Sequence, residues 1–120
     1  MNASPTFQSG LEHEQHALDH LQAHGLELLT RNYRCRIGEI DLIVQDGDTT
    51  VFVEVRYRKS GRHGGALASI HHGKAWRIAR TAQAYLKACG APADTPIRFD
   101  VVAIDGEPPR LSWVRAAFEF

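Results

Sequence analysis

The sequence predicts one mixed α/β domain in which helices flank a small central sheet, and three observations support this fold class. Apolar residues recur at helical spacing in two segments, about residues 10–24 and 69–88. Short runs rich in β-branched and aromatic residues predict four strands, at residues 26–36, 39–44, 50–58 and 97–104. A length of 120 residues, with 43% hydrophobic and 23% charged, suits one globular core and is too short for two.

The N-terminal segment, residues 1–9, contains Pro, Ser and Asn without periodicity, so we expect a flexible tail there and a single domain in residues 10–120. The apolar face of the first helix is formed by Leu11, Leu18 and Leu21, with Ala17 near its edge. Gly25 is a suitable C-terminal cap, because glycine adopts the left-handed conformation that often ends a helix.

The middle of the chain predicts a β-hairpin, because Asp46-Gly47 separates two strand-like runs. A two-residue Gly47-Asp48 loop, or a four-residue loop, pairs positions whose numbers sum to 95 and places Asp41 opposite Glu54. A register one residue different would separate these two acids.

The second half of the domain begins with a glycine-rich basic loop at residues 59–65. A helix over residues 69–88 follows, ending near Cys89-Gly90, and then a Pro-containing turn leads to a buried strand. Residues 111–120 could form a last strand or a short helix. The expected order is α-β-β-β-α-β.

The chain has no apolar run near the roughly 20 residues that a membrane-spanning helix needs, and its polar start does not resemble a signal peptide. We therefore expect a cytoplasmic protein without a membrane partner. The formal net charge is zero, yet residues 31–80 carry ten Lys and Arg against five Asp and Glu. A polyanion could bind this locally basic region, and a solvated surface without a partner is the alternative.

Three carboxylates stand where an interior sheet should be apolar. Strand alternation puts Glu39 and Asp41 on one face and Ile40, Leu42 and Val44 on the other. Facing carboxylates such as Asp41 and Glu54 destabilise a ladder.

The first helix repeats this oddity, because Glu14 lies at the spacing of the buried leucines. A buried carboxylate needs a partner, a proton or a metal ion, and converging acids could bind a hard divalent cation. The alternative is that Glu14 pairs with an arginine at the edge of the helix face and that Glu39 is exposed.

Several motifs, in this order and at these spacings, resemble the bacterial YraN family. They are G-x-x-x-E (Gly10, Glu14), A-x-x-x-L (Ala17, Leu21), Gly25, R-N (Arg31, Asn32), GEIDLI (38–43), VFVEVRYR (51–58), GGALASI (64–70), Lys74, AQAYL (82–86) and RFDVV (98–102). The resemblance covers about residues 10–118. That largely uncharacterised family looks like a branch of the restriction-endonuclease-like nucleases, nearest to archaeal Holliday-junction resolvases, so it implies a restriction-endonuclease-like fold.

Those enzymes hydrolyse phosphodiesters with magnesium through a D-x(n)-(E/D)-x-K core and an added acid from the first helix. The resemblance implies that Asp41 is the motif aspartate, Glu54 the second acid and Glu14 the helix acid. Asp41 and Glu54, with the Val55 carbonyl, would hold Mg²⁺ or Mn²⁺, and Glu14 would complete the cluster, with Glu39 secondary. Arg56 occupies the lysine position, where it gives charge but cannot act as a base.

The expected function is therefore a magnesium-dependent endonuclease that binds and hydrolyses structured or branched DNA, with a homodimer suggested by analogy. A catalytically inactive DNA-binding or protein-interaction module with the same fold is the alternative, because arginine replaces lysine. Further phosphate contacts are expected from Arg58, Lys59, Arg62 and Lys74, and solvation alone is the competing interpretation. Lys74 could reach either a phosphate or one of the acids.

The remaining polar and aromatic residues are assigned structural roles. Asp100 lies in an apolar strand and could form a salt bridge with Arg98. The four aromatic residues expected to belong to the core are Trp76, Tyr85, Trp113 and Phe118. The histidines of the first helix, which we expect on a solvated face rather than in a metal site, are His13, His16, His20 and His24.

Overall fold

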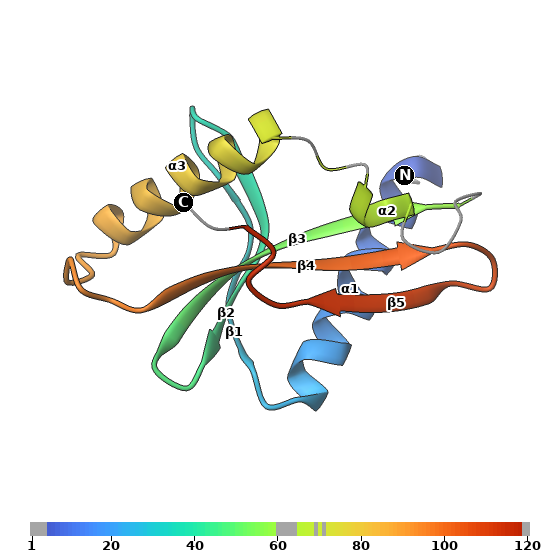
Figure 1. The fold of residues 1–120 in the computed structure, drawn as a ribbon, viewed down its shortest axis with the longest axis horizontal. Helices are drawn as coiled ribbons and strands as arrows, with labels where there is room; N and C mark the ends of the chain where they lie inside the picture. Colours follow the sequence, from blue (N-terminus) through green and yellow to red (C-terminus); the bar gives the residue numbers. More distant parts are fainter. Residues whose placement is uncertain (1–4, 60–64, 69, 71, 119–120) are drawn as a thin grey trace.

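A computed structural model describes residues 5–59, 65–68, 70 and 72–118 of the chain. It contains a five-stranded sheet in the order β1-β2-β3-β4-β5, with helices on both faces (Figure 1), which confirms the predicted mixed α/β class. The helices are α1 (Pro5–Ala23), α2 (Gly65–Ala68) and α3 (His72–Ala88). The strands are β1 (Glu27–Arg34), β2 (Glu39–Asp46), β3 (Thr49–Arg58), β4 (Ile97–Asp105) and β5 (Arg110–Val114). None of the described helices is long and apolar enough to cross a membrane.

The strands pair antiparallel except at the centre of the sheet, where β3 and β4 are parallel. Parallel neighbours need a long crossover connection, and the segment containing α2 and α3 supplies it. The last strand, β5, pairs with β4 and forms one edge of the sheet. The open choice for residues 111–120 is therefore resolved in favour of a strand at its start.

Helix α1 begins at Pro5 rather than at Gly10, so part of the expected tail is helical. Proline suits the first turn of a helix, because its fixed φ is helical and its missing N–H needs no partner there. At the other end, Gly25 has a φ of 89°, and the N–H of Leu26 donates to the carbonyl of Leu21 at 3.2 Å. This is a Schellman cap, as the glycine predicted.

The helix expected over residues 69–88 is α3, which begins at His72, and a short helix, α2, precedes the expected range. Helix α3 ends as predicted: Gly90 has a φ of 68°, and the N–H of Ala91 donates to the carbonyl of Leu86 at 2.9 Å. A short helix such as α2 has too few residues to show a clear periodicity, so the sequence pattern missed it.

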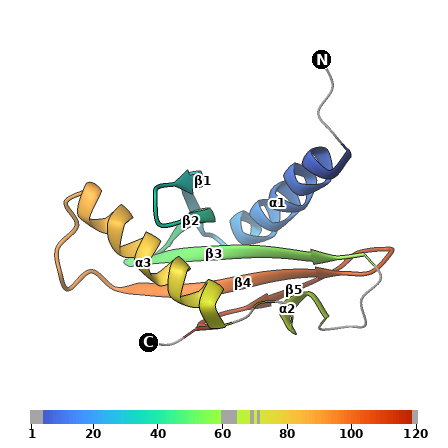
Figure 2. The ribbon, with the colours of Figure 1, turned by 90° about the horizontal axis from the view of Figure 1, so that it is seen from above.

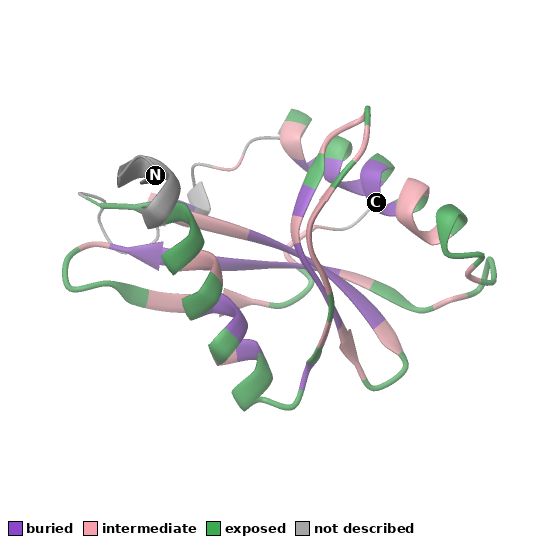
Figure 3. Cartoon of the chain, turned by 180° about the vertical axis from the view of Figure 1, so that it is seen from behind, coloured by how far each residue is buried: buried purple, intermediate pink, exposed green. Residues whose placement is uncertain are grey.

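The two faces of the sheet carry separate cores. Leu18 and Leu21 of α1 pack against one face with Val51 and Val53 of β3. Helix α3 covers the other face, where Ile78 and its neighbours pack against β2, β3 and β4. Figure 2 shows α1 and α2 on opposite sides of the sheet, and Figure 3 shows that buried residues concentrate in the strands and on the inner sides of the helices.

The β1–β2 ribbon turns away from β3 at the middle of the molecule, so that it runs steeply across the line of β3, β4 and β5 in Figure 1. The predicted alternation is wrong here: Leu42 and Val44 face α1, but Ile40 packs in the core beneath α3. Two-stranded ribbons twist more strongly than wide sheets, and the twist carries Ile40 to the other side.

Candidate metal and phosphodiester site

The candidate site lies where β2 and β3 separate. Their pairing runs from Asp46–Thr49 to Leu42–Val53, with position numbers that sum to 95, so the predicted register is confirmed. Gly47, with a φ of 60°, makes the two-residue turn that sets this register. The next pair in this register would be Asp41 and Glu54, at the point where the strands diverge.

The backbone ladder between β2 and β3 is paired only as far as Leu42 and Val53, and beyond it the side chain of Asp41 provides a hydrogen-bond acceptor for β3. The backbone N–H of Val55 donates to Oδ2 of Asp41 at 2.8 Å. In an extended strand the N–H and C=O of one residue face the same neighbouring strand. The Val55 carbonyl therefore also faces the β2 side. Residues an odd number apart along a strand direct their backbone groups to opposite sides, and the N–H of Thr50, five residues before Val55, indeed donates to Pro96 on the β4 side.

Glu54 is buried on β3, with 5% of its side chain exposed, and forms an ion pair with Lys74 of α3 at 2.6 Å. Of the two contacts that the sequence left open for Lys74, the structure has the one with an acid. A buried carboxylate without such a partner would cost several kcal/mol (~3–5). The pair therefore fixes Glu54 on the side of the sheet that α3 covers.

Glu14 reaches the same region from α1. Burial raises the pKa of Glu14, and the negative charges of Glu39 and Glu54 raise this pKa further. A hydrogen bond from the Asn32 side chain and the positive charge of Arg31 act in the opposite direction. Within the described part of the chain, Oε1 of Glu14 is buried without a hydrogen-bond partner.

The carboxyl group of Asp41 is the most perturbed member of this group. Burial raises the pKa of Asp41 well above its ordinary range, and the negative charges of Glu54 and Glu14 add to the effect. The Val55 N–H and the positive charge of Lys74 oppose it. We call Glu14, Asp41 and Glu54 the acid cluster, because the charges of Glu54 and Glu14 both raise the pKa of Asp41.

The acid cluster is not drawn tightly together. Among the described residues, no three His, Cys, Asp or Glu side chains are close enough to hold one metal ion jointly. A hard divalent cation would instead find carboxylate oxygens of Asp41 and Glu54 and the β2-facing carbonyl of Val55, all oxygen donors of the type that Mg²⁺ prefers. The unpartnered oxygen of Glu14 is consistent with such a cation, since a nearby positive charge would relieve its burial.

The other predicted site residues lie around the acid cluster. Arg56 is half-buried on β3, on the same face as Glu54, and Arg58 and Lys59 are exposed at the end of that strand. Arg62 lies outside the described residues. Glu39 is half-exposed and pairs with Arg34 at 2.8 Å.

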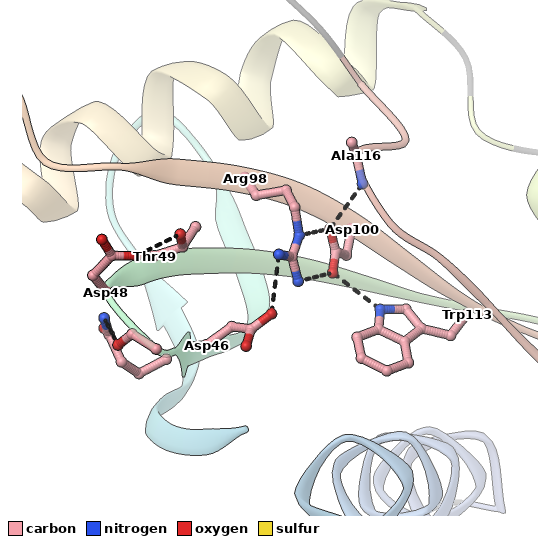
Figure 4. Close-up of polar contacts among 9 residues, drawn as sticks. Asp46, Asp48, Thr49, Arg98, Asp100, Trp113 and Ala116 are labelled. Atoms are coloured by element: carbon pink, nitrogen blue, oxygen red, sulfur yellow. Dashed lines mark hydrogen bonds and ion pairs between the residues drawn. The ribbon is translucent and has the colours of Figure 1, made fainter. Parts of the chain in front are cut away.

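Asp100 of β4 forms a separate, structural network (Figure 4). Its carboxylate accepts two hydrogen bonds from Arg98 at 2.9 and 3.0 Å, one from Trp113 Nε1 at 3.0 Å and one from the N–H of Ala116 at 3.0 Å. Arg98 also pairs with Asp46 at 3.0 Å. The predicted partner of Asp100 is confirmed, and the network ties β4 to β5 and to the β2–β3 turn.

Two expectations about surface and core are wrong. Trp76, expected in the core, has half of its surface exposed, because it lies outside the apolar stripe of α3 that packs on the sheet. Among the helix histidines, His13 and His20 are half-buried rather than solvated. His13 stacks on Tyr57 of β3 with 3.7 Å between ring centroids, since α1 crosses the sheet at this point.

Sequence reasoning also missed Asn32 as a contact of Glu14. In the structure Asn32 has a φ of 50°, which is uncommon for a residue other than glycine. A further signal was available in the charge pattern. Between Glu54 and Asp94 the sequence contains no Asp or Glu. The Lys and Arg residues in that interval are Arg56, Arg58, Lys59, Arg62, Lys74, Arg77, Arg80 and Lys87.

Comparison with known proteins places the chain in a family. The model of the uncharacterised protein family UPF0102 matches residues 13–104. A UPF0102 protein of Pseudomonas fluorescens is 50% identical over 113 residues, which cover 94% of each chain. A UPF0102 protein of Nitrosomonas europaea is 50% identical over 111 residues, 92% of each chain. One from Alkalilimnicola ehrlichii is 50% identical over 115 residues, 96% of this chain and 90% of the relative. The chain therefore belongs to the UPF0102 family, the YraN family that its motifs resemble.

Proposed function

We propose that the protein is a metal-dependent endonuclease that acts on structured or branched DNA and has a restriction-endonuclease-like fold. The observation that carries the proposal is the acid cluster at the divergence of β2 and β3, where the pKa values of Asp41 and Glu14 are raised by burial and by neighbouring acids. Perturbed pKa values of neighbouring acids are found more often at functional sites than elsewhere. The basic interval that follows Glu54 provides the charge for a polyanionic substrate.

The residues have separate roles in this proposal. Asp41 and Glu54, with the Val55 carbonyl, would hold Mg²⁺ or Mn²⁺, and Glu14 would orient a water molecule. The bound ion would supply an activated water and offset charge on the leaving oxygen. The Val55 N–H keeps one oxygen of Asp41 in place at 2.8 Å, which leaves the other for the ion.

Lys74 offers an answer to the missing lysine of the nuclease motif. Its ammonium group is 2.6 Å from Glu54, although it comes from α3 rather than from β3. In that position it can hold Glu54 and contribute positive charge near a scissile phosphate, while Arg56 adds charge from the neighbouring strand position. We therefore assign the role of the motif lysine, positive charge near the scissile phosphate, to Lys74 rather than to Arg56.

The test uses purified protein with four-way junction and flap DNA, in Mg²⁺, Mn²⁺ or EDTA. We expect metal-dependent cleavage that falls by about 100-fold or more in Asp41→Asn and Glu54→Gln, since these changes remove ligand charge and keep shape. Glu39→Gln is the matched control, because Glu39 is also a strand carboxylate but pairs with Arg34 at the surface. Binding without metal-dependent cleavage of either substrate would contradict the enzyme and favour the inactive DNA-binding alternative.

The same assay separates the two cations. Lys74→Gln should lower the cleavage rate by about 10-fold or more, and Arg56→Lys should leave it nearly unchanged if Lys74 serves the site. A large gain of cleavage in Arg56→Lys would contradict this assignment and return the role to the β3 position.

A further inference from the structure

The exposed side of α3 carries a pocket that the acid cluster does not use. The pocket has a volume of about 650 Å³, in the range of small-molecule sites, and lies between α3, the start of β4 and the C-terminal segment. Its lining includes Trp76, Ala79, Arg80, Gln83, Ile97 and Phe99. Trp76 is 50% exposed and Ile97 is 39% exposed, so the pocket presents apolar surface to solvent.

Helix α3 brings positively charged side chains to one side of this pocket. Helix α3 contains Lys74, Arg77, Arg80 and Lys87 and no acidic residue. Arg98 also lines the pocket, but Asp46 and Asp100 neutralise it at 3.0 and 2.9 Å. Among the described residues that line the pocket, Arg80 is the exposed cation at its rim.

A line of cations connects the pocket with the acid cluster. Lys74, Arg77 and Arg80 follow one another at intervals of three residues, so successive side chains are about 60° apart around the helix and about 4.5 Å apart along it. Arg77 lies with Lys74 and Glu39 in a smaller hollow of about 220 Å³ beside the acid cluster. Arg77 thus stands between that hollow and the pocket of Trp76.

We propose that this surface binds a single-stranded DNA segment, with phosphates on Arg77 and Arg80 and an unpaired base stacked on Trp76 in the pocket. An exposed aromatic ring beside arginines is the arrangement that binds single strands, because every base has a face for stacking. A duplex would not use the ring, since its bases are already stacked. The proposal rests on the proposed function and extends it: the DNA that reaches the acid cluster has a single-stranded arm that crosses α3.

The experiment measures affinity in EDTA, so that cleavage does not enter the result. The probes are a fluorescent 12-nucleotide oligothymidylate and an abasic oligomer of the same length and the same phosphate charge. We expect Trp76→Ala to weaken binding of oligothymidylate by about 5-fold or more, the effect of losing one base–aromatic contact, and to leave abasic binding unchanged. Trp76→Phe should restore most of the affinity. Leu29→Ala, which removes an apolar side chain that is 45% exposed on β1, is the matched control.

The inference is overturned if Trp76→Ala binds oligothymidylate like the wild-type protein, or if it weakens both probes equally. This failure is distinct from failure of the proposed function. If the protein cleaves DNA with metal but Trp76→Ala does not weaken oligothymidylate binding, only the proposed stacking site is contradicted. If Trp76→Ala weakens binding of oligothymidylate but not of the abasic oligomer, and no substrate is cleaved, the proposed nuclease activity is contradicted and the stacking site is supported.

Discussion

Asp41 is the central residue of the candidate site, because burial and the charges of Glu54 and Glu14 raise its pKa. The raised pKa of Asp41 means that the folded protein holds a proton at pH values where the unfolded chain has released it. The contribution of Asp41 to folding stability is therefore most favourable at or below the ordinary pKa of 3.8, and it falls as the pH rises towards the raised pKa. Above the raised pKa, the folded protein bears the full destabilisation from the ionised Asp41, unless a bound cation offsets the charge.

Replacing this carboxylate should stabilise the metal-free protein. In EDTA at neutral pH, we expect Asp41→Asn to raise the free energy of unfolding by about 0.2–1 kcal/mol, because it removes like-charge repulsion and keeps an oxygen that accepts from Val55. Urea unfolding across pH 4–8 measures this. Mg²⁺ should raise the Tm of the wild-type protein and not that of the variant, since a ligand stabilises only the protein that binds it.

Asp48→Asn is the control, because Asp48 is an exposed aspartate in the β2–β3 turn. It should leave both the unfolding free energy and the Mg²⁺ response unchanged. An Asp41→Asn protein that is less stable than wild type in EDTA would show that the acid cluster is not under electrostatic strain.

At the scale of elements, the Asp100 network links β4 to β5 and to the segment that follows β5. Asp100 is fully buried and accepts hydrogen bonds from β4, from Trp113 on β5 and from Ala116 after it. Strand β5 is short and half-buried, so its hydrophobic burial alone is modest. The network therefore adds side-chain hydrogen bonds to the backbone ladder between β4 and β5.

We expect Asp100→Ala to lower the free energy of unfolding by about 3–5 kcal/mol, because it leaves Trp113 and part of Arg98 without a partner. Chemical denaturation measures the loss, and hydrogen exchange should show that β5 opens before β3. Asp94→Ala, at an exposed position, should change stability by less than about 0.5 kcal/mol. Equal exchange protection of β5 in Asp100→Ala and wild type would argue against the network as its anchor.

These elements also show how far sequence reasoning reached. Local signals predicted the two glycine caps and the turn at Gly47, because each depends on the conformation of one residue. They did not predict the position of Ile40, which depends on the twist of a whole ribbon after it leaves β3. The outward position of Trp76 was missed for a similar reason: the apolar stripe of α3 extends over Ile78, Ala82 and Leu86, and a tryptophan outside it was counted as core.

At the scale of the molecule, the divergence of β2 from β3 is what brings distant residues together. Glu14 comes from α1, Asp41 and Glu54 from the separating strands, and Lys74 from the crossover helix on the opposite face. The turn predicted the β2–β3 register that places Asp41 opposite Glu54. The helical spacing of Glu14 predicted that it approaches the sheet. The contact of Lys74 with Glu54 depends on how α3 crosses the sheet, which no local pattern encodes.

The most direct test of the central claim is a crystal structure of the protein soaked in Mn²⁺, with the ion located by anomalous scattering. We expect an ion within about 2.0–2.3 Å of oxygens from Asp41, Glu54 and the Val55 carbonyl, and no ion at that place in Asp41→Asn. Saturating Mn²⁺ with no ion between these residues, and with Lys74 still paired to Glu54, would contradict it.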